Sequence, residues 1–208
     1  MRGHPTLRHE RKLWREGARV VAGVDEAGVG PMAGPVVAAA VIFEQEIFIR
    51  GVNDSKQLAP ERRAALFPRI QEKALAVGVG IATPAEIDQL NIFWATMAAS
   101  ARALQALTVT PDHVLVDGRR IAELKLPQTP IVGGDRKSFC IAAASIIAKV
   151  TRDRMMLEYD AQYPAYGFAR HKGYCTAEHF AALARAGPSA IHRRSFAPVW
   201  EAAQRRLF

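Results

Sequence analysis

The segment between two apolar runs near the start of the chain limits the possible folds more than any other. The first run ends in Asp25 and Glu26, and the second begins directly after Pro35 as VVAAAVIF. Between them, GVGPMAGP holds three glycines and two prolines. Proline fixes φ and lacks an amide donor, so a helix does not fit into this segment. We therefore predict two neighbouring strands, over 20–25 and 36–43, that a short loop connects.

Helices and strands are predicted to alternate along the rest of the chain. Apolar residues recur at helical spacing in the longer segments, and short apolar runs lie between them. Phe93 and Trp94 belong to such a helical stripe and are expected in the core. Alternating elements with one hairpin-like pair predict an α/β fold with a mixed sheet. The predicted helices cover 60–74, 84–107, 138–159, 176–186 and 198–205, and the further predicted strands cover 77–82, 113–116 and 131–132.

The charge of the chain favours a polyanionic partner. Its 28 Lys and Arg residues exceed its 20 Asp and Glu residues, which gives a net charge of +8 and a pI near 9.9. Such an excess of positive charge suits a nucleic acid. A basic protein without such a partner remains the alternative on composition alone.

The cysteines and the N-terminus favour a soluble protein of a reducing compartment. Cys140 and Cys175 are the only cysteines, too few for a disulfide framework or a zinc cage. Residues 1–18 are basic and lack the apolar stretch of a signal peptide. The uncharged stretch 138–148 is too short to span a bilayer. We expect a cytoplasmic monomer without membrane contact, in which a single domain over 19–208 follows the basic segment.

Four acidic residues lie where predicted strands end. Asp25 and Glu26 end the first strand, Asp117 ends a later one as VLVDG, and Asp135 follows a short strand in IVGGD. One such acid alone is usually a turn cap, but several at one sheet edge repel one another, and a divalent cation relieves the repulsion. Oxygen ligands favour Mg²⁺ or Mn²⁺ over zinc. Because two such ions about 4 Å apart can clamp a phosphodiester, the set predicts two-metal phosphoryl chemistry.

A second motif overlaps the glycine segment. Gly28, Gly30 and Ala33 match GxGxxG/A, and Asp54 follows at about the distance expected of a ribose ligand in a dinucleotide-binding fold. That motif needs a helix directly after the glycines, where this sequence predicts a loop and a strand. Two acids at the strand end would also repel a pyrophosphate. A dinucleotide-dependent oxidoreductase is therefore the weaker hypothesis.

The order of the motifs resembles that of a known family. The chain holds DEAG-x-GP-x-AGPVVAAAV, NDSKQL, VDG, GGDRKSFCIAAASIIAKVTRDR, YGFARHKGY and HRRSFAPV, from about residue 20 to residue 199. In these motifs it resembles bacterial ribonuclease HII, the type 2 ribonuclease H that cuts the RNA strand of RNA–DNA hybrids and cuts at single ribonucleotides in duplex DNA. The resemblance implies the ribonuclease H-like α/β fold, a mixed sheet flanked by helices, with a C-terminal helical extension.

The resemblance also implies roles for particular residues. Asp25, Glu26, Asp117 and Asp135 would be the catalytic carboxylates and would hold Mg²⁺ or Mn²⁺. Water would attack the phosphorus and leave a 3′-hydroxyl and a 5′-phosphate. Tyr174 would pack against the deoxyribose that follows the ribonucleotide.

In this family, backbone groups of the glycine loop, here Gly28 to Gly30, lie against the ribose and its 2′-hydroxyl. That hydroxyl distinguishes RNA from DNA, and glycine permits the close approach. The family usually has an arginine or a lysine between the two glycines, where this chain has Val29, so we expect a weaker grip on a phosphate. A non-catalytic hybrid-binding module weakened at Val29 is the alternative to an enzyme, and the presence of all four carboxylates disfavours it.

Further residues complete the expected site. Lys56 is a predicted phosphate contact, and Lys172 is predicted to help hold the duplex. Asp153 is an alternative fourth metal ligand, but Asp135 is favoured because it lies beside Asp117 at a strand end. The basic residues near the C-terminus are predicted to be surface or structural residues: His171, His192, Arg193 and Arg194.

Overall fold

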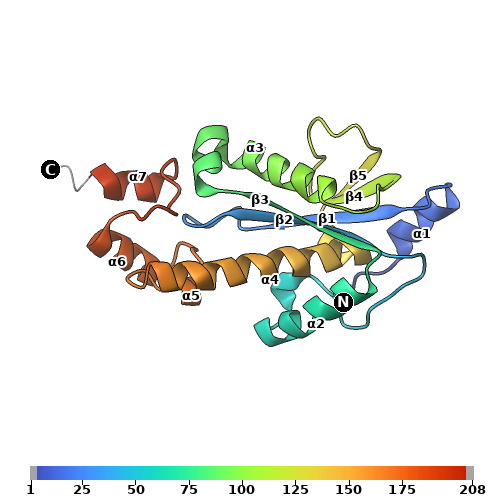
Figure 1. The fold of residues 1–208 in the computed structure, drawn as a ribbon, viewed down its shortest axis with the longest axis horizontal. Helices are drawn as coiled ribbons and strands as arrows, with labels where there is room; N and C mark the ends of the chain where they lie inside the picture. The colour runs from blue at the N-terminus through green and yellow to red at the C-terminus, as the bar shows by residue number, and fades with distance from the viewer. Residues whose placement is uncertain (1–3, 205–208) are drawn as a thin grey trace.

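The predicted strand pair forms an antiparallel hairpin inside a five-stranded sheet (Figure 1). The computed structural model describes residues 4–204. In the hairpin, Asp25 lies opposite Ala39. Its first strand also pairs in parallel with the strand that ends in Asp117, so the sheet is mixed, as predicted. In the order in which they lie side by side, the strands are β3 (Ala76–Ala82), β2 (Val36–Ile42), β1 (Val21–Ala27), β4 (His113–Asp117) and β5 (Gln128–Ile131).

Helices cover both faces of this sheet (Figure 1). Helix α3 packs on one face, against β2 and β3, and α4 packs on the other, against β1 and β2. No helix within residues 4–204 combines the length and the apolar character that a bilayer span requires. The predicted helix end at Arg205 lies outside the described residues. The helices are α1 (Arg8–Arg15), α2 (Pro60–Lys73), α3 (Pro84–Gln105), α4 (Phe139–Gln162), α5 (Phe168–His171), α6 (Ala177–Ala186) and α7 (Ala197–Gln204), and two 3-10 turns are η1 (Ser55–Gln57) and η2 (Gly134–Arg136).

Strand β1 lies directly against the start of α4. A Cβ atom on Gly23 would come within 2.2 Å of the backbone carbonyl carbon of Cys140, so only glycine permits this approach. Successive side chains of a strand point to opposite faces. Val24 accordingly packs into the core beneath α3, whereas Asp25 shares the α4 face with Gly23. The tight contact at Gly23 thus brings the first acid of the predicted site close to α4.

The prediction that Phe93 and Trp94 are core residues is wrong. Helix α3 is kinked at Asn91, whose φ of 67° lies in the left-handed region. The Asn91 side chain accepts the amide hydrogens of Phe93 and Trp94, as a cap does at the start of a helix. The helix restarts there in a new direction, and the two aromatic residues are 41% and 46% exposed.

The last strand lies earlier in the chain than the sequence predicts. The predicted range is 131–132, but β5 ends at Ile131. Its residue Pro130 has no amide hydrogen to donate, and an edge strand such as β5 tolerates that loss. Parallel pairing with β4 places Ile131 opposite Asp117. This pairing fixes the point from which the following turn departs.

The N-terminal basic segment contains a helix, α1, that the sequence pattern did not predict. Its residue Glu10 is fully buried although α1 is otherwise rich in exposed charge. The Glu10 carboxylate accepts hydrogen bonds from the Ser138 hydroxyl at 2.6 Å and from the Cys140 amide at 3.0 Å. A carboxylate is favourable at this position because the amides at a helix N-terminus carry partial positive charge. Helix α1 is therefore anchored to the start of α4.

Candidate active site

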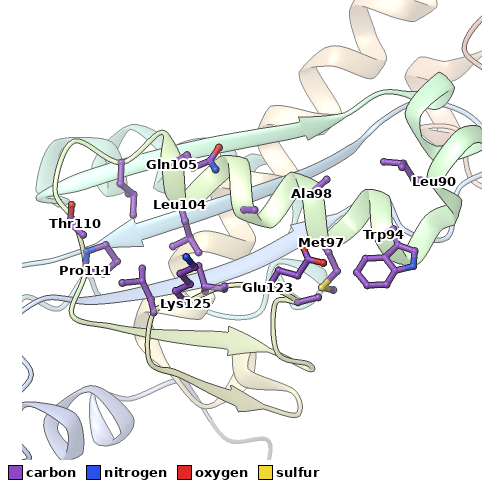
Figure 2. A pocket seen from close by; sticks show the side chains of 15 residues that line it. Leu90, Trp94, Met97, Ala98, Leu104, Gln105, Thr110, Pro111, Glu123 and Lys125 are labelled. Carbon is purple, nitrogen blue, oxygen red and sulfur yellow. The ribbon is translucent and has the colours of Figure 1, made fainter.

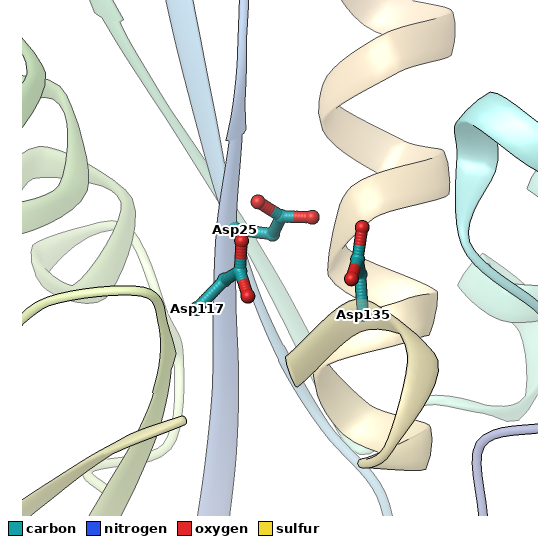
Figure 3. Close-up of side chains that lie close together, drawn as sticks. All are labelled: Asp25, Asp117 and Asp135. Atoms are coloured by element: carbon teal, nitrogen blue, oxygen red, sulfur yellow. The ribbon is translucent and has the colours of Figure 1, made fainter. Parts of the chain in front are cut away.

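Three carboxylates from separate elements meet at one edge of the sheet (Figure 3). Asp25 comes from β1, Asp117 is the last residue of β4, and Asp135 comes from η2. One oxygen atom of each lies within 4.8 Å of an oxygen of the other two. The parallel register pairs Val24 with Val116 and so brings Asp25 level with Asp117. The predicted convergence of these three acids is confirmed.

Backbone hydrogen bonds hold two of the three carboxylates in place, those of Asp25 and Asp117. The amide of Gly134 donates to Oδ1 of Asp117 at 2.6 Å, which ties η2 to the end of β4. Gly133 precedes this turn with a φ of 63°, a left-handed conformation that glycine adopts readily. Oδ1 of Asp25 accepts the amide of Glu26 at 2.7 Å. The turn after β5 thus folds back and carries Asp135 towards the strand ends.

Glu26 lies beside this cluster, on the other face of β1. It lines a cavity of about 340 Å³ together with Asp117, Val29 and Phe93. Burial and the charge of Asp117 raise the pKa of Glu26 to about 7. The structure therefore joins Asp25, Asp117 and Asp135 in one group and places Glu26 next to it. Glu26 is close enough that, in addition to burial, its charge raises the pKa of Asp25 and the charge of Asp117 raises the pKa of Glu26 itself.

The cluster is electrostatically suited to a divalent cation. Burial, followed by the charges of Glu26 and Asp117, raises the pKa of Asp25 well above its usual range. Burial and the charges of Asp54 and Asp117 raise the pKa of Asp135 to about 6. The donor atoms are all carboxylate oxygens that repel one another, and hard cations such as Mg²⁺ or Mn²⁺ prefer this donor set. The residues present therefore fit a metal centre.

Lys56 faces the acidic cluster from η1. Burial by itself would lower the pKa of Lys56, but the charges of Asp25 and Asp135 help to raise it above its usual value. The amide of Ser55 donates to the hydroxyl of Ser145 at 3.2 Å, which fixes η1 on α4. The structure therefore places the predicted phosphate-binding lysine beside the carboxylates.

Asp54 is a neighbour of the site that the sequence analysis considered only for the rejected dinucleotide motif. Its carboxylate is buried, accepts the Lys56 amide at 2.9 Å, and accepts the Gln57 side chain at 3.1 Å. Its charge also contributes to the raised pKa of Asp135. Aspartate side chains often accept the backbone amide two residues further on and so stabilise a turn, but this tendency alone does not link Asp54 to the site. Through its hydrogen bonds, Asp54 shapes the turn that carries Lys56.

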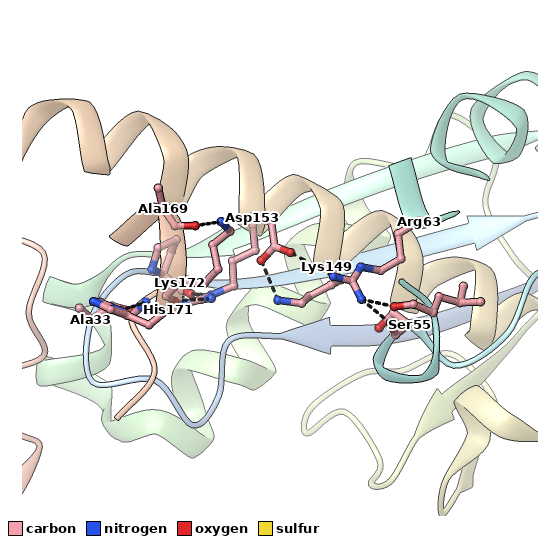
Figure 4. Close-up of polar contacts among 12 residues, drawn as sticks. Ala33, Ser55, Arg63, Lys149, Asp153, Ala169, His171 and Lys172 are labelled. Atoms are coloured by element: carbon pink, nitrogen blue, oxygen red, sulfur yellow. Dashed lines mark hydrogen bonds and ion pairs between the residues drawn. The ribbon is translucent and has the colours of Figure 1, made fainter. Parts of the chain in front are cut away.

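Asp153, the alternative metal ligand, is paired with basic side chains instead (Figure 4). Its Oδ1 lies 2.6 Å from Nζ of Lys149, and its Oδ2 lies 3.7 Å from a guanidinium nitrogen of Arg63. The same arginine donates to the carbonyl oxygen of Ser55 at 2.8 Å. Asp153 thus takes no part in the carboxylate cluster and links α4 to the η1 turn.

The two predicted glycines of the substrate loop have different surroundings. Gly28 has a φ of +95°, and a Cβ atom there would lie 2.1 Å from Nε of Arg152. Gly30 has no positive φ, and a Cβ atom there would meet nothing within 4 Å. Between them, the side chain of Val29 is 39% exposed. The fold therefore requires glycine at position 28, whereas at position 30 the protein leaves open space.

Tyr174 is held by its backbone and leaves its ring accessible. It is 40% exposed, and its ring centroid lies 5.7 Å from both Nζ of Lys149 and the guanidinium carbon of Arg152. Its carbonyl oxygen lies 2.9 Å from Nδ1 of His179, and Nε2 of His179 lies 3.1 Å from Nε2 of His192. Burial lowers the pKa of His179 to about 4 and that of His192 to about 3. Two buried neutral imidazoles thus support Tyr174.

Lys172 directs its ammonium group towards its own helix. Its Nζ donates to the carbonyl oxygen of Ala169, and its backbone is left-handed with a φ of 52°. Burial lowers the pKa of Lys172. A role in holding the duplex would require the side chain to leave this bond.

A larger groove lies away from the carboxylates (Figure 2). It has a volume of about 690 Å³ and runs between α3 and the segment 122–126. Its lining includes Leu90, Trp94 and Met97 from α3 and apolar residues of the facing segment. None of the predicted site residues lines it. The predicted site residues therefore lie outside this groove, and three of them, Glu26, Val29 and Asp117, line the smaller cavity instead.

Known proteins are similar to this chain in sequence and in fold. A family model described as ribonuclease HII matches residues 22–199. The chain is 55% identical to ribonuclease HII of Geobacillus kaustophilus (strain HTA426) over 195 residues, which cover 94% of this chain and 75% of the relative. It is 56% identical to ribonuclease HII of Moorella thermoacetica over 187 residues, which cover 90% and 91%. The crystal structure of ribonuclease H2 from Pyrococcus horikoshii OT3 is similar, with a TM-score of 0.79 and 28% identity over 89% of this chain and 98% of that one.

Proposed function

Since this chain belongs to the ribonuclease HII family, and is therefore a metal-dependent ribonuclease H that acts on RNA–DNA hybrids, we propose that it also cuts duplex DNA 5′ of a single embedded ribonucleotide. The products are a 3′-hydroxyl and a 5′-phosphate. The observation that carries this proposal is the carboxylate cluster of Asp25, Asp117 and Asp135. The glycine loop follows Asp25 closely in the chain and is exposed at Val29 and Gly30, and Val29 lines the same cavity as Asp117.

Asp25, Asp117 and Asp135 would hold the metal, with Glu26 contributing from the other face of β1. We propose Mg²⁺ or Mn²⁺, because the donors are oxygen atoms only. A pair of such ions, when bound, neutralises the charge that develops on the attacking and leaving oxygens of the phosphodiester. Lys56 would donate to a phosphate oxygen and offset part of the remaining negative charge, and its position facing the cluster supports this role.

Sugar recognition is assigned to the glycine loop and Tyr174. The open space at Gly30 supports this assignment, because nothing in the protein itself requires glycine there. A ribose that approaches the backbone closely would require it. The exposed ring of Tyr174 would pack against the neighbouring deoxyribose, and Lys172 would contact the backbone of the duplex.

The working unit is one catalytic domain from residue 19 to residue 208, preceded by the basic segment 1–18 that packs on it through α1. We propose that this unit acts as a monomer in the cytoplasm, where it removes ribonucleotides from DNA. The two cysteines, Cys140 and Cys175, are both free, which suits a reducing compartment.

Cleavage of an end-labelled duplex with one central ribonucleotide tests this function. The expected result is a single cut 5′ of the ribonucleotide, which requires Mg²⁺ or Mn²⁺ and is absent from an all-DNA duplex of the same sequence. Tight binding of the ribonucleotide duplex without any cut, at all metal concentrations, would support the non-catalytic binding module instead.

Val29→Arg is expected to tighten substrate binding. A guanidinium at this exposed position could donate charge-assisted hydrogen bonds to a phosphate, and such bonds contribute about 1.5–3 kcal/mol, less where water screens them. We expect a KM about tenfold lower on the ribonucleotide duplex, and a higher kcat if the contact tightens as charge develops. Steady-state kinetics of both proteins measure this. Unchanged constants would mean that the side chain points away from the substrate.

A further inference from the structure

Two fully buried arginines lie behind the glycine loop. Arg152 comes from α4 and Arg193 from the segment between α6 and α7, and both side chains have 0% exposure. Within residues 4–204, neither guanidinium forms an ion pair with a carboxylate. Burying an unpaired charge is costly unless hydrogen bonds compensate it. The groups that accept hydrogen bonds from the two arginines therefore indicate the role of these buried charges.

All hydrogen-bond partners of the two guanidinium groups are backbone carbonyl groups, and most belong to one loop. Arg193 donates from Nε to Gly34 at 2.9 Å, from one terminal nitrogen to Val29 at 2.9 Å, and from the other to Gly28. Arg152 donates to the carbonyl groups of Pro35 at 2.9 Å, Ala33 at 3.1 Å and Lys172 at 3.0 Å. Residues 28–35 are thus held from behind at five of their carbonyl oxygens.

The bonds of Arg193 determine which backbone groups of the loop remain available. They engage the carbonyl oxygens of Gly28 and Val29, the two peptide units that precede Gly30. Within the described chain, no hydrogen bond uses the amide hydrogens of Val29 and Gly30. Arg193 thus holds the carbonyl groups of Gly28 and Val29 on the side of the loop that faces the protein. Among residues 4–204, the amides of Val29 and Gly30 remain without a partner, next to the open space at Gly30.

We infer that Arg193 is a positioning residue for sugar selection. Its planar guanidinium fixes the carbonyl groups of Gly28 and Val29, and this orients the amides of Val29 and Gly30 so that they can donate hydrogen bonds to a ribose. This inference rests on the proposed recognition of the sugar by the loop. Arg193 does not touch the substrate and acts through the backbone. The role needs arginine, because a lysine ammonium carries the same charge without the rigid fork that spans three carbonyl oxygens.

The test compares Arg193→Lys with two controls. Arg152→Lys removes the fork of the other buried arginine, whose bonds go to the far end of the loop and to Lys172. Arg194→Lys makes the same change on the exposed neighbour. Dissociation constants are measured in EDTA, which prevents cleavage, for a duplex with one ribonucleotide and for the all-DNA duplex. The ratio of the two constants gives the preference for ribose.

Arg193→Lys is expected to lower this preference about tenfold, which corresponds to about 1.4 kcal/mol, by weakening the ribonucleotide complex while the all-DNA complex changes little. Arg152→Lys should destabilise the protein but keep most of the preference for ribose. Arg194→Lys should change neither the stability of the protein nor this preference. Equal weakening of both complexes by Arg193→Lys, with an unchanged ratio, would mean a merely structural role and would overturn the inference.

Hydrogen exchange of the natural protein provides a second test that does not depend on the folding of a variant. The ribonucleotide duplex should slow exchange of the amides at positions 29 and 30, and the all-DNA duplex should not. Equal protection by both would overturn the inference. If the natural protein shows no preference for ribose in either experiment, the proposed function itself fails. If it shows the preference and Arg193→Lys retains it, only the role of Arg193 fails.

Discussion

Asp25→Asn is expected to lower cleavage of the ribonucleotide duplex by on the order of a thousandfold or more. A metal clamp contributes several kcal/mol of charge stabilisation to the transition state, and each 1.36 kcal/mol is a factor of about ten in rate. Asp25 is a buried member of the cluster, so the substitution removes one of the three carboxylates that are proposed to hold the metal. Single-turnover cleavage in saturating Mg²⁺ or Mn²⁺ measures the loss. Near-natural activity of this variant would rule out the assigned site.

The fold should survive this substitution and gain stability without metal. The pKa of Asp25 is raised in the folded protein, so the natural protein loses stability as the pH rises from about 4 through that raised value. The asparagine of the variant carries no charge, and its side-chain oxygen can still accept the Glu26 amide. In EDTA, the melting temperature of the variant should exceed that of the natural protein at about pH 8, and the difference should vanish near pH 4.

Asp153→Asn is the matched control for Asp25→Asn. Asp153 is a partly buried acid, but it pairs with Lys149 and lies outside the cluster. This variant should retain most of its cleavage activity and its metal dependence. A loss as large as that of Asp25→Asn would point to Asp153 as the ligand and contradict the choice of Asp135.

Gly30→Ala is expected to lower kcat/KM on the ribonucleotide duplex by about a hundredfold while the protein remains at least as stable. The added methyl group would meet nothing within 4 Å in the protein, and Gly30 has no positive φ. Such a change stabilises a folded chain by about 0.4–1 kcal/mol, because it restricts the unfolded chain. A displaced reactive phosphate can cost about a hundredfold in rate. Thermal unfolding and steady-state kinetics together measure the two effects.

Gly28→Ala provides the contrast, because there the protein itself forbids a side chain. Its φ of +95° and the close Arg152 side chain would strain the folded state, and backbone strain alone costs about 1–3 kcal/mol. This variant should lose stability and activity together. If Gly30→Ala were as active as the natural protein, no substrate would approach the loop there, and the assignment of sugar recognition would be wrong.

Much of the fold and of the carboxylate cluster could be predicted from the sequence because both depend on local rules. Proline and glycine after Asp25 excluded a helix, which left a hairpin, and the hairpin made the sheet mixed. Parallel pairing of β1 with β4 then brought Asp25 and Asp117 to the same edge. Asp135 followed because a short strand and a tight turn leave little freedom for its position.

The features that escaped prediction depend on contacts between distant parts of the chain. Glu10 and Arg193 are charged residues whose burial is favourable only because backbone groups more than a hundred residues away complete their hydrogen bonds. Their local sequence is polar and gives no sign of this. The kink at Asn91 exposed Phe93 and Trp94 although the spacing of apolar residues fits one continuous helix. Periodicity carries no information about such a change of direction.

The anchoring of α1 has a consequence for attempts to shorten the protein. The region that the family model matches begins at residue 22, which invites a minimal fragment without α1. Such a fragment would lack the Glu10 carboxylate and would leave the Ser138 hydroxyl and the Cys140 amide without their partner. Those groups lie only a few residues beyond Asp135. Helix α1 therefore supports the segment that follows Asp135, and we expect the smallest fully active fragment to begin before this helix.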